Sequence, residues 1–245
     1  MAHLYGGQSE YLISSERKNQ QRINHYALVG LLLFVAELIY TFVYRSGLLK
    51  FSILLIIVDI IAIIFFLPKL GLYGAVRDNF HNGHRAEGRA WYLLRRLSHQ
   101  FHVFQDIKDI NRLWGNIDFV VVGPTGVYTV EVKSHKGVIR FDGSDLTRNW
   151  RRFTEKNFLK QAKGQAYSIN DFIKTKIVED LWIKPLIVFT SSVAYVRVGT
   201  TEVSGVHVLH GNNFIQFIQN QRVILSDSEI KKIISAFCGA GFCIK

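Results

Sequence analysis

The chain has 245 residues, of which 49% are hydrophobic, and its formal net charge is +11. This length accommodates one sizeable globular domain and a further segment. The two cysteines are too few for a disulfide framework, and without nearby Cys or His they are not typical of a zinc site, so reduced thiols are expected. Residues 1–70 hold six of the 30 Lys and Arg and four of the 19 Asp and Glu, so most of the positive excess lies beyond them. A basic domain favours an anionic partner, either nucleic acid or an acidic membrane surface.

Two apolar stretches near the start are long enough to be membrane-spanning helices. Residues 26–44 contain Glu37 as their only charged residue, and residues 51–67 contain only Asp59. Each stretch is near the length that crosses a bilayer core of about 30 Å as a helix. The alternative is a buried helical hairpin in a soluble core. We favour a transmembrane hairpin, and the chain then divides into a cytoplasmic N-terminal segment, this hairpin, a linker and a globular domain, at residues 1–25, 26–70, 71–82 and 83–245.

Basic residues flank the predicted hairpin on its outer sides. They are Arg17, Lys18 and Arg22 before it and Lys69, Arg77, Arg85 and Arg89 after it, against Arg45 and Lys50 in the connection. The positive-inside rule therefore predicts a two-pass protein with both termini and the globular domain in the cytoplasm. Intramembrane acids are costly and suggest a role. For Glu37 and Asp59 we favour helix packing or homo-oligomer contacts over ion or proton conduction.

The globular domain has the pattern of an α/β fold. Residues 85–97 carry apolar residues at the spacing of an amphipathic helix. Further strands are predicted at residues 102–106, 116–122, 127–132, 138–141, 186–189 and 206–209, and further helices at 156–174, 213–219 and 226–237. A single domain with a mixed sheet is the simplest interpretation of this order.

Three charged residues interrupt two otherwise apolar strands. Glu131 and Lys133 share one face of their strand because side chains alternate. If the G-P-T-G turn joins two antiparallel strands, Asp118 lies opposite Glu131 and the three side chains converge. Two carboxylates with a lysine suit metal-assisted phosphodiester hydrolysis. The alternative interpretation is a surface ion pair on a solvated sheet face.

The stretch I-D-F-V-V-V-G-P-T-G-V-Y-T-V-E-V-K-S-H-K-G-V-I resembles the core of the nuclease-related domain family, NERD, a branch of the PD-(D/E)xK restriction-endonuclease-like fold. Further segments in the same order are similar to family motifs, namely G-H-R-A-E-G-R-A-W, Trp150 followed by N-F-L-K-Q, and P-L-I-V-F. The resemblance covers roughly residues 83–237. It implies a restriction-endonuclease-like mixed sheet flanked by helices.

The resemblance also implies roles for individual residues. Asp118 and Glu131 would be ligands of Mg²⁺ (or Mn²⁺), and Lys133 would be the catalytic lysine. Glu87, which lies off the apolar stripe of its helix, would be an additional acid near the metal, and Gln161 would reach toward the site from a later helix.

Basic and aromatic residues gather before and along that later helix. They are Arg148, Trp150, Arg151, Arg152, Lys156, Lys160 and Lys163. Such a cluster can follow phosphates while the tryptophan stacks on bases. The alternative is a solvated helix face with Trp150 in the core.

We therefore expect a membrane-anchored, Mg²⁺-dependent nuclease whose partners are the lipid bilayer and nucleic acid, with DNA favoured over RNA. The alternative from another class is a non-catalytic scaffold that keeps the nuclease fold and binds nucleic acid or a partner at the membrane. A small channel or transporter built on Glu37 and Asp59 is the least favoured interpretation.

Overall fold

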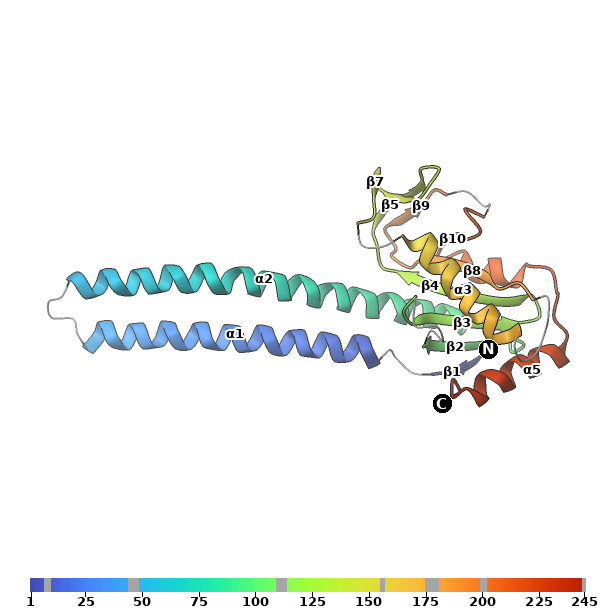
Figure 1. The fold of residues 1–245 in the computed structure, drawn as a ribbon, viewed down its shortest axis with the longest axis horizontal. Helices are drawn as coiled ribbons and strands as arrows, with labels where there is room; N and C mark the ends of the chain where they lie inside the picture. Colours follow the sequence, from blue (N-terminus) through green and yellow to red (C-terminus); the bar gives the residue numbers. More distant parts are fainter. Residues whose placement is uncertain are drawn as a thin grey trace. The chain divides into compact units, whose positions relative to one another are not determined.

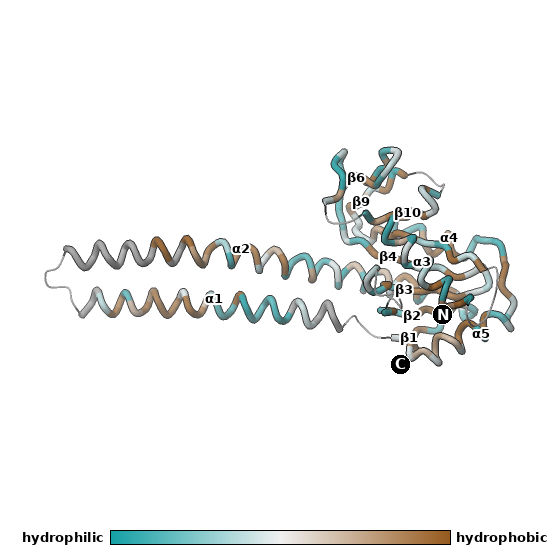
Figure 2. Tube along the Cα trace, in the orientation of Figure 1, coloured by the Kyte–Doolittle hydropathy of each residue, from teal (hydrophilic) through white to brown (hydrophobic). Residues whose placement is uncertain are grey.

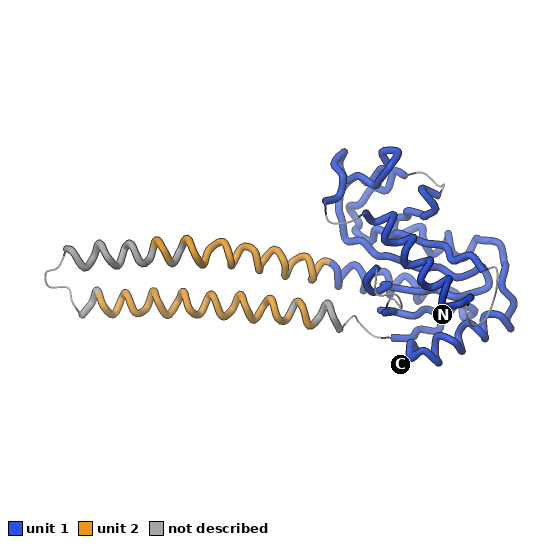
Figure 3. Tube along the Cα trace, in the orientation of Figure 1, with its two compact units in different colours: residues 1–9, 83–245 blue, residues 10–82 orange. Residues whose placement is uncertain are grey.

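The structure is a computed structural model that describes residues 1–6, 10–43, 49–108, 114–154, 157–174, 181–198 and 202–243. The chain divides into two compact units (Figure 3). One unit comprises residues 1–9 and 83–245, and the other comprises residues 10–82.

The unit of residues 10–82 consists of two antiparallel helices. Helix α1 spans Glu10–Val43, and helix α2 spans Leu49–Leu94 and continues into the other unit. The Arg77 guanidinium donates a hydrogen bond to Gln20 at 3.1 Å, and Tyr26 stacks on Tyr73 with ring centroids 5.5 Å apart. If the two helices stay paired in this way, Glu37 of α1 lies at about the same height along the helix axis as residue 59 of α2. The side chain of residue 59 is outside the described part.

The apolar residues of α1 lie in its C-terminal part and the polar ones in its N-terminal part (Figure 2). Residues Arg17–Tyr40 are long and apolar enough to cross a membrane, and this is the one such helix within the described residues. Length and composition are the only basis, and a signal sequence near the N-terminus meets the same criterion. Most side chains of the second predicted span, residues 51–67, lie outside the described part.

The helix α2 differs from the sequence prediction at two places. Residues 71–82, which we expected to be a linker, are helical, and the helix ends at Leu94, three residues before the predicted end at residue 97. Gly71 and Gly74 do not interrupt the helix, because isolated glycines cost only about 1 kcal/mol each in a helix interior.

The unit of residues 1–9 and 83–245 contains a mixed sheet of six strands in the order β1-β2-β3-β4-β8-β10 (Figure 1). The strands are β1 (His3–Tyr5), β2 (His102–Ile107), β3 (Ile117–Gly123), β4 (Gly126–Lys133), β8 (Lys184–Phe189) and β10 (His207–His210). Strands β2, β3 and β4 are antiparallel neighbours, whereas β4, β8 and β10 run parallel. The mixed α/β fold with a sheet flanked by helices is confirmed.

Helices cover both faces of this sheet. On one face, the end of α2 and helix α4 (Phe214–Gln219) pack through Ala90, Leu94 and Phe214 against Phe119 and Val130. On the other face lie α3 (Phe158–Lys174) and α5 (Asp227–Gly239), which bury apolar side chains against the alternate residues of β3. Alternation along the strands thus supplies two apolar faces, as a sheet buried on both sides requires.

A second sheet and the strand β1 were not predicted from the sequence. The second sheet has the order β7-β6-β5-β9, from Arg151–Arg152, Leu146–Arg148, Gly137–Phe141 and Ala194–Val196. The sequence analysis assigned only the strand at 138–141, since strands of two or three residues are too short to show a period. Strand β1 pairs with β2 through His3, Leu4 and Tyr5. The predicted segment 1–25 therefore contributes an edge strand to the large sheet.

The C-terminal cysteines form a disulfide between Cys238 and Cys243, so the expectation of two reduced thiols was wrong for this structure. Helix α5 ends at Gly239, and Gly241 adopts φ of 85°, which turns the chain back. The Phe242 amide then donates a hydrogen bond to the Phe237 carbonyl at 3.0 Å. This turn brings the two Cα atoms within 4.6 Å, a separation that the sequence spacing did not reveal.

We predict that Gly164→Ala destabilises the protein, because a Cβ atom at this position on α3 would overlap the indole of Trp114. Overpacking costs about 1–3 kcal/mol, which exceeds the gain of about 1 kcal/mol in helix propensity. The melting temperature should fall. In Gly88→Ala, on α2, the added Cβ meets no atom within 4 Å, and the melting temperature should stay level or rise. An unchanged melting temperature for Gly164→Ala would contradict the packing described.

Candidate active site

One edge of the large sheet collects the predicted site residues. Glu131 and Lys133 lie at the C-terminal end of strand β4, and Asp118 is the second residue of the antiparallel strand β3, at the same edge of the sheet. In the register of the two strands, Phe119 pairs with Val130, which places Asp118 across from Glu131. The predicted convergence of the three residues is confirmed, whereas their catalytic roles stay predictions.

Glu131 is the centre of the hydrogen-bond network at this edge. Its carboxylate is buried, with 5% of the residue exposed. The ammonium of Lys133 lies 2.6 Å from Oε1, and the Gln161 amide donates to the same oxygen at 2.9 Å. The Gln165 amide donates to Oε2 at 2.7 Å. Both oxygens are thus satisfied, as a buried charge requires.

Asp118 and Glu87 are close enough to Glu131 for its charge to raise their pKa values. Burial raises the pKa of Asp118, and the charges of Glu131 and Glu87 raise it further. The Val132 amide donates to Asp118 Oδ2 at 2.7 Å, which acts in the opposite direction. Burial, Asp106 and Glu131 raise the pKa of Glu87 to about 7. The three acids are therefore close enough to disfavour one another's charge.

The sequence analysis missed two residues of this edge, Gln165 and Asp106. Gln165 follows Gln161 by one helical turn, and this polar pair at i, i+4 beside an apolar stripe was the available signal. Asp106 lies on β2 with φ of 54°, and it accepts a hydrogen bond from the Asn116 side chain at 2.8 Å. No local pattern in the sequence predicts this backbone conformation. Asp106 contributes to the raised pKa of Glu87.

The donor set at this edge fits a hard divalent cation. Asp118 and Glu131 offer carboxylate oxygens, and the Oε1 atoms of Gln161 and Gln165 are buried without a hydrogen-bond partner. Mg²⁺ needs only one or two carboxylates and completes its shell with water and substrate oxygens. Within the described residues no group of three or more His, Cys, Asp or Glu side chains is arranged as a metal site. The fit therefore rests on two carboxylates and the amide oxygens.

The predicted nucleic-acid residues fall into two groups. Arg148, Trp150, Arg151 and Arg152 lie on the β6–β7 hairpin of the small sheet, while Lys160 and Lys163 lie on α3. Lys156 lies outside the described residues. Phe153, directly after the hairpin, packs on Phe158 with centroids 4.6 Å apart. The Lys133 ammonium lies 4.2 Å from the centroid of Phe158. Aromatic contacts therefore connect the hairpin to the sheet edge that holds Asp118, Glu131 and Lys133, which we call the carboxylate edge.

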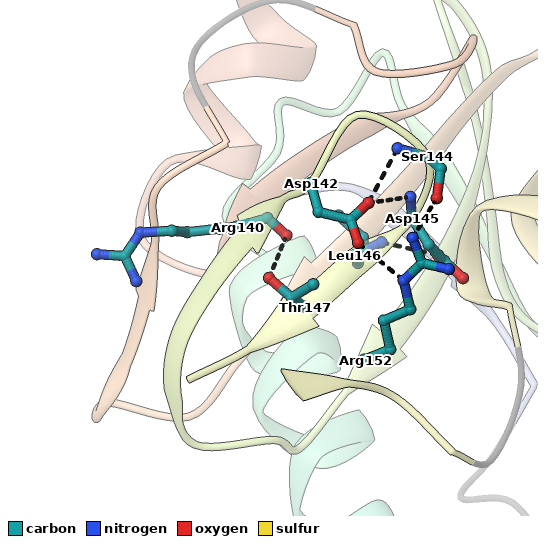
Figure 4. A network of polar contacts seen from close by, with 7 residues as sticks. All are labelled: Arg140, Asp142, Ser144, Asp145, Leu146, Thr147 and Arg152. Carbon is teal, nitrogen blue, oxygen red and sulfur yellow. Dashed lines mark hydrogen bonds and ion pairs between the residues drawn. The ribbon is translucent and has the colours of Figure 1, made fainter. Parts of the chain in front are cut away.

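The guanidinium of Arg152 on the hairpin binds side chains of the turn between β5 and β6 (Figure 4). It donates to Asp142 at 2.8 Å and to the Ser144 hydroxyl at 2.8 Å. Asp142 also accepts hydrogen bonds from the backbone amides of Asp145 and Ser144, and these bonds together with Arg152 hold its pKa well below the ordinary value. Arg152 therefore stabilises the β5–β6 turn through these hydrogen bonds.

Trp150 is presented to solvent at the tip of the hairpin, with 78% of its surface exposed. Trp150 is not a core residue, so the core position that the alternative interpretation gave it was wrong. Asn149 and Trp150 form a two-residue turn with φ of 50° and 69°, the pattern of a type I′ turn. A bulky residue with positive φ costs about 1–3 kcal/mol and is typical of functional positions. The Arg140 guanidinium lies 4.1 Å from the ring centroid and steadies it.

Comparison with protein families identifies the part of the chain that holds these residues. Residues 82–190 match the model described as the nuclease-related domain, NERD. Comparisons with curated proteins and with solved structures give no match. The matched segment begins on α2 just before Glu87 and ends just after β8, so it includes the carboxylate edge and the hairpin. The resemblance seen in the motifs is confirmed for residues 82–190, the segment that matches the nuclease-related domain.

Proposed function

We propose that the chain is a metal-dependent nuclease that hydrolyses phosphodiester bonds of DNA or RNA and is anchored in a membrane by its two long helices. The convergence of Asp118, Glu131 and Lys133 at one sheet edge, within the nuclease-related domain, carries this proposal. The nuclease-related domain supports nucleic acid as the class of partner.

The proposed chemistry divides among the residues of the edge. Asp118 and Glu131 would hold Mg²⁺ (or Mn²⁺), which when bound polarises the phosphate and lowers the pKa of a water molecule. Gln161 and Gln165 fix the orientation of the Glu131 carboxylate. Lys133 places a positive charge beside Glu131, where it would orient the attacking water or offset developing negative charge.

Glu87 is suited to proton transfer in this mechanism. Its pKa of about 7 means that it is partly protonated at neutral pH. A group with a pKa near the working pH serves best as a general acid or base.

Asp118→Asn should lower the rate of Mg²⁺-dependent cleavage by at least about 100-fold, the scale for removing one group that stabilises the transition state. Asparagine keeps an oxygen that can accept the Val132 amide hydrogen bond. The assay should use the full chain in detergent, because truncation before residue 83 would remove strand β1 from the sheet. Single-stranded, duplex and branched substrates should be tested with and without a chelator.

The matched control is Asp171→Asn, an exposed aspartate on α3 outside the carboxylate edge, which should cleave like the wild type. Absence of cleavage by the wild type on every substrate, together with no Mg²⁺ or Mn²⁺ binding in calorimetry, would favour the non-catalytic scaffold. Loss of cleavage in both variants would indicate a general effect of charge instead of a metal ligand.

We further propose that Trp150 stacks on an unpaired base. Trp150→Gly should weaken binding of a single-stranded oligonucleotide by about 5–150-fold, since stacking on one base contributes about 1–3 kcal/mol. Glycine adopts positive φ without steric cost, so the melting temperature should stay level or rise. Binding can be followed by fluorescence anisotropy in a chelator. Trp182→Ala, at another exposed tryptophan, is the control, and equal affinity in the two variants would contradict the proposal.

The strand β1 supports a two-pass anchor over a single span. Residues 3–5 pair with β2 in the same unit as residues 83–245. If α1 crosses a membrane, the chain must cross back before residue 83 to form that sheet. The apolar first part of α2 supplies this second crossing. The basic residues of the flanks favour the cytoplasm for the domain. The disulfide is more typical of an oxidising compartment, so the side of the membrane needs a direct test.

Cysteine labelling provides this test. In a background of Cys238→Ser and Cys243→Ser, we expect Ser46→Cys, in the helix connection, to react with an impermeant maleimide on intact cells. Ser144→Cys, at an exposed turn of the domain, should react only after the cells are permeabilised. The reverse pattern would place the domain outside the cytoplasm, and labelling of both positions on intact cells would contradict membrane insertion.

A further inference from the structure

A second group of side chains lies at the same sheet edge as the carboxylates. Strands β4, β8 and β10 are parallel, so their C-terminal ends meet at one edge. The carboxylates occupy the part of this edge formed by β3 and β4. At the C-terminal ends of β8 and β10 there is a pocket of about 580 Å³.

Three segments of the nuclease-like unit build this pocket. Helix α2 supplies Arg85, Arg89 and Tyr92, the residues after β8 supply Thr190, and those around the end of β10 supply His210. Glu87 lies between the two arginines in sequence, but the helical period directs it away from them. The same helix therefore presents an acid to the carboxylates and two cations to the pocket.

Hydrogen bonds fix the walls of the pocket. The Arg89 guanidinium donates to the Thr190 carbonyl at 3.4 Å, and the Thr190 hydroxyl donates to the Ala86 carbonyl at 3.3 Å. The Asn212 amide donates to His210 Nδ1 at 3.2 Å, which leaves Nε2 to donate to the Ser191 carbonyl at 3.1 Å. Each ring nitrogen of His210 thus has a hydrogen-bond partner in the pocket wall.

The charge of the pocket is positive. Arg85 and Arg89 line it, and none of the residues that line it, all of them described, is an aspartate or glutamate. Guanidinium groups bind phosphate oxygens in a planar, paired geometry. The exposed ring of Tyr92 at the same pocket offers a surface on which a base can stack.

A backbone hydrogen bond connects the pocket to the carboxylate edge. The Thr190 amide donates to the Lys133 carbonyl at 3.1 Å, so the pocket wall is attached to the strand that carries Glu131 and Lys133. Neighbouring strands are about 4.8 Å apart, so the pocket lies roughly one to two strand spacings from β4. A nucleic-acid strand laid along this edge would therefore reach both places.

We propose that this pocket binds a phosphate of the nucleic-acid strand next to the phosphodiester that is hydrolysed. The inference rests on the proposed nuclease function and adds a phosphate subsite to it. Arg85 and Arg89 neutralise the phosphate, and the bound phosphate fixes the position of the strand relative to Asp118 and Glu131.

The test compares two double variants of the full chain in detergent. Arg85→Gln with Arg89→Gln removes the pocket charge, and Arg95→Gln with Arg96→Gln removes equal charge from exposed positions just after α2. Affinity for a short single-stranded oligonucleotide is measured in a chelator at several salt concentrations. The pocket variant should bind about 10-fold more weakly or worse, and the slope of log K against log salt should fall by about one. The control variant should bind within about threefold of the wild type.

Three outcomes separate this inference from the proposed function. Equal affinity and equal salt slope in the two double variants would overturn the phosphate pocket and leave the nuclease proposal standing. Absence of binding by the wild type would overturn the phosphate pocket, whereas the nuclease proposal is decided separately by the cleavage and metal-binding assays. If the loss of the Arg89 bond to Thr190 lowers the melting temperature, Arg85→Gln alone, at an exposed helix position, should still weaken binding more than Arg95→Gln alone.

Discussion

The buried carboxylate of Glu131 is the constraint on which the site depends. An ionised carboxylate in a sheet interior is costly unless its oxygens are paired. Lys133, Gln161 and Gln165 provide this pairing, and they come from one strand and one helix. Helix α3 must therefore lie across β4 at one register. The apolar residues of α3 fix this position, because they pack against β2 and β3 on the same face of the sheet.

The directions in which the strands run place acidic and basic residues at different parts of the same sheet edge. Antiparallel pairing brings Asp106 and Asp118 to the end of β4, while parallel pairing brings the ends of β8 and β10 beside it. The result is an acidic region suited to a metal and a basic region suited to phosphate. In the proposed function, the carboxylates of the acidic region would hold the cation and the arginines of the basic region would position the polyanion. Burial, together with the charges of the neighbouring carboxylates, raises the pKa values of Asp118 and Glu87.

The N-terminal strand restricts how the chain can meet a membrane. Because residues 3–5 are part of the large sheet, the helical segment of residues 10–82 leaves one unit and returns to it. Any anchor formed by that segment must have an even number of crossings. The polar first half of α1 and the polar later part of α2 contain basic and aromatic residues of the kind that is enriched at membrane interfaces, and among them Arg22 lies over the ring of Tyr73.

The sequence by itself determined the α/β class, the main strands and helices, and the convergence of Asp118, Glu131 and Lys133. These follow from local signals, namely residue periodicity, a G-P-T-G turn and motifs in order. Only the tertiary structure decided the contribution of β1, the small sheet, the position of Trp150 at a hairpin tip, and the joining of Cys238 to Cys243. Gln165 and the pocket at Arg85 and Arg89 also emerged only there. The physical reason is that short strands and polar side chains owe their positions to partners far away in sequence, which local patterns do not encode.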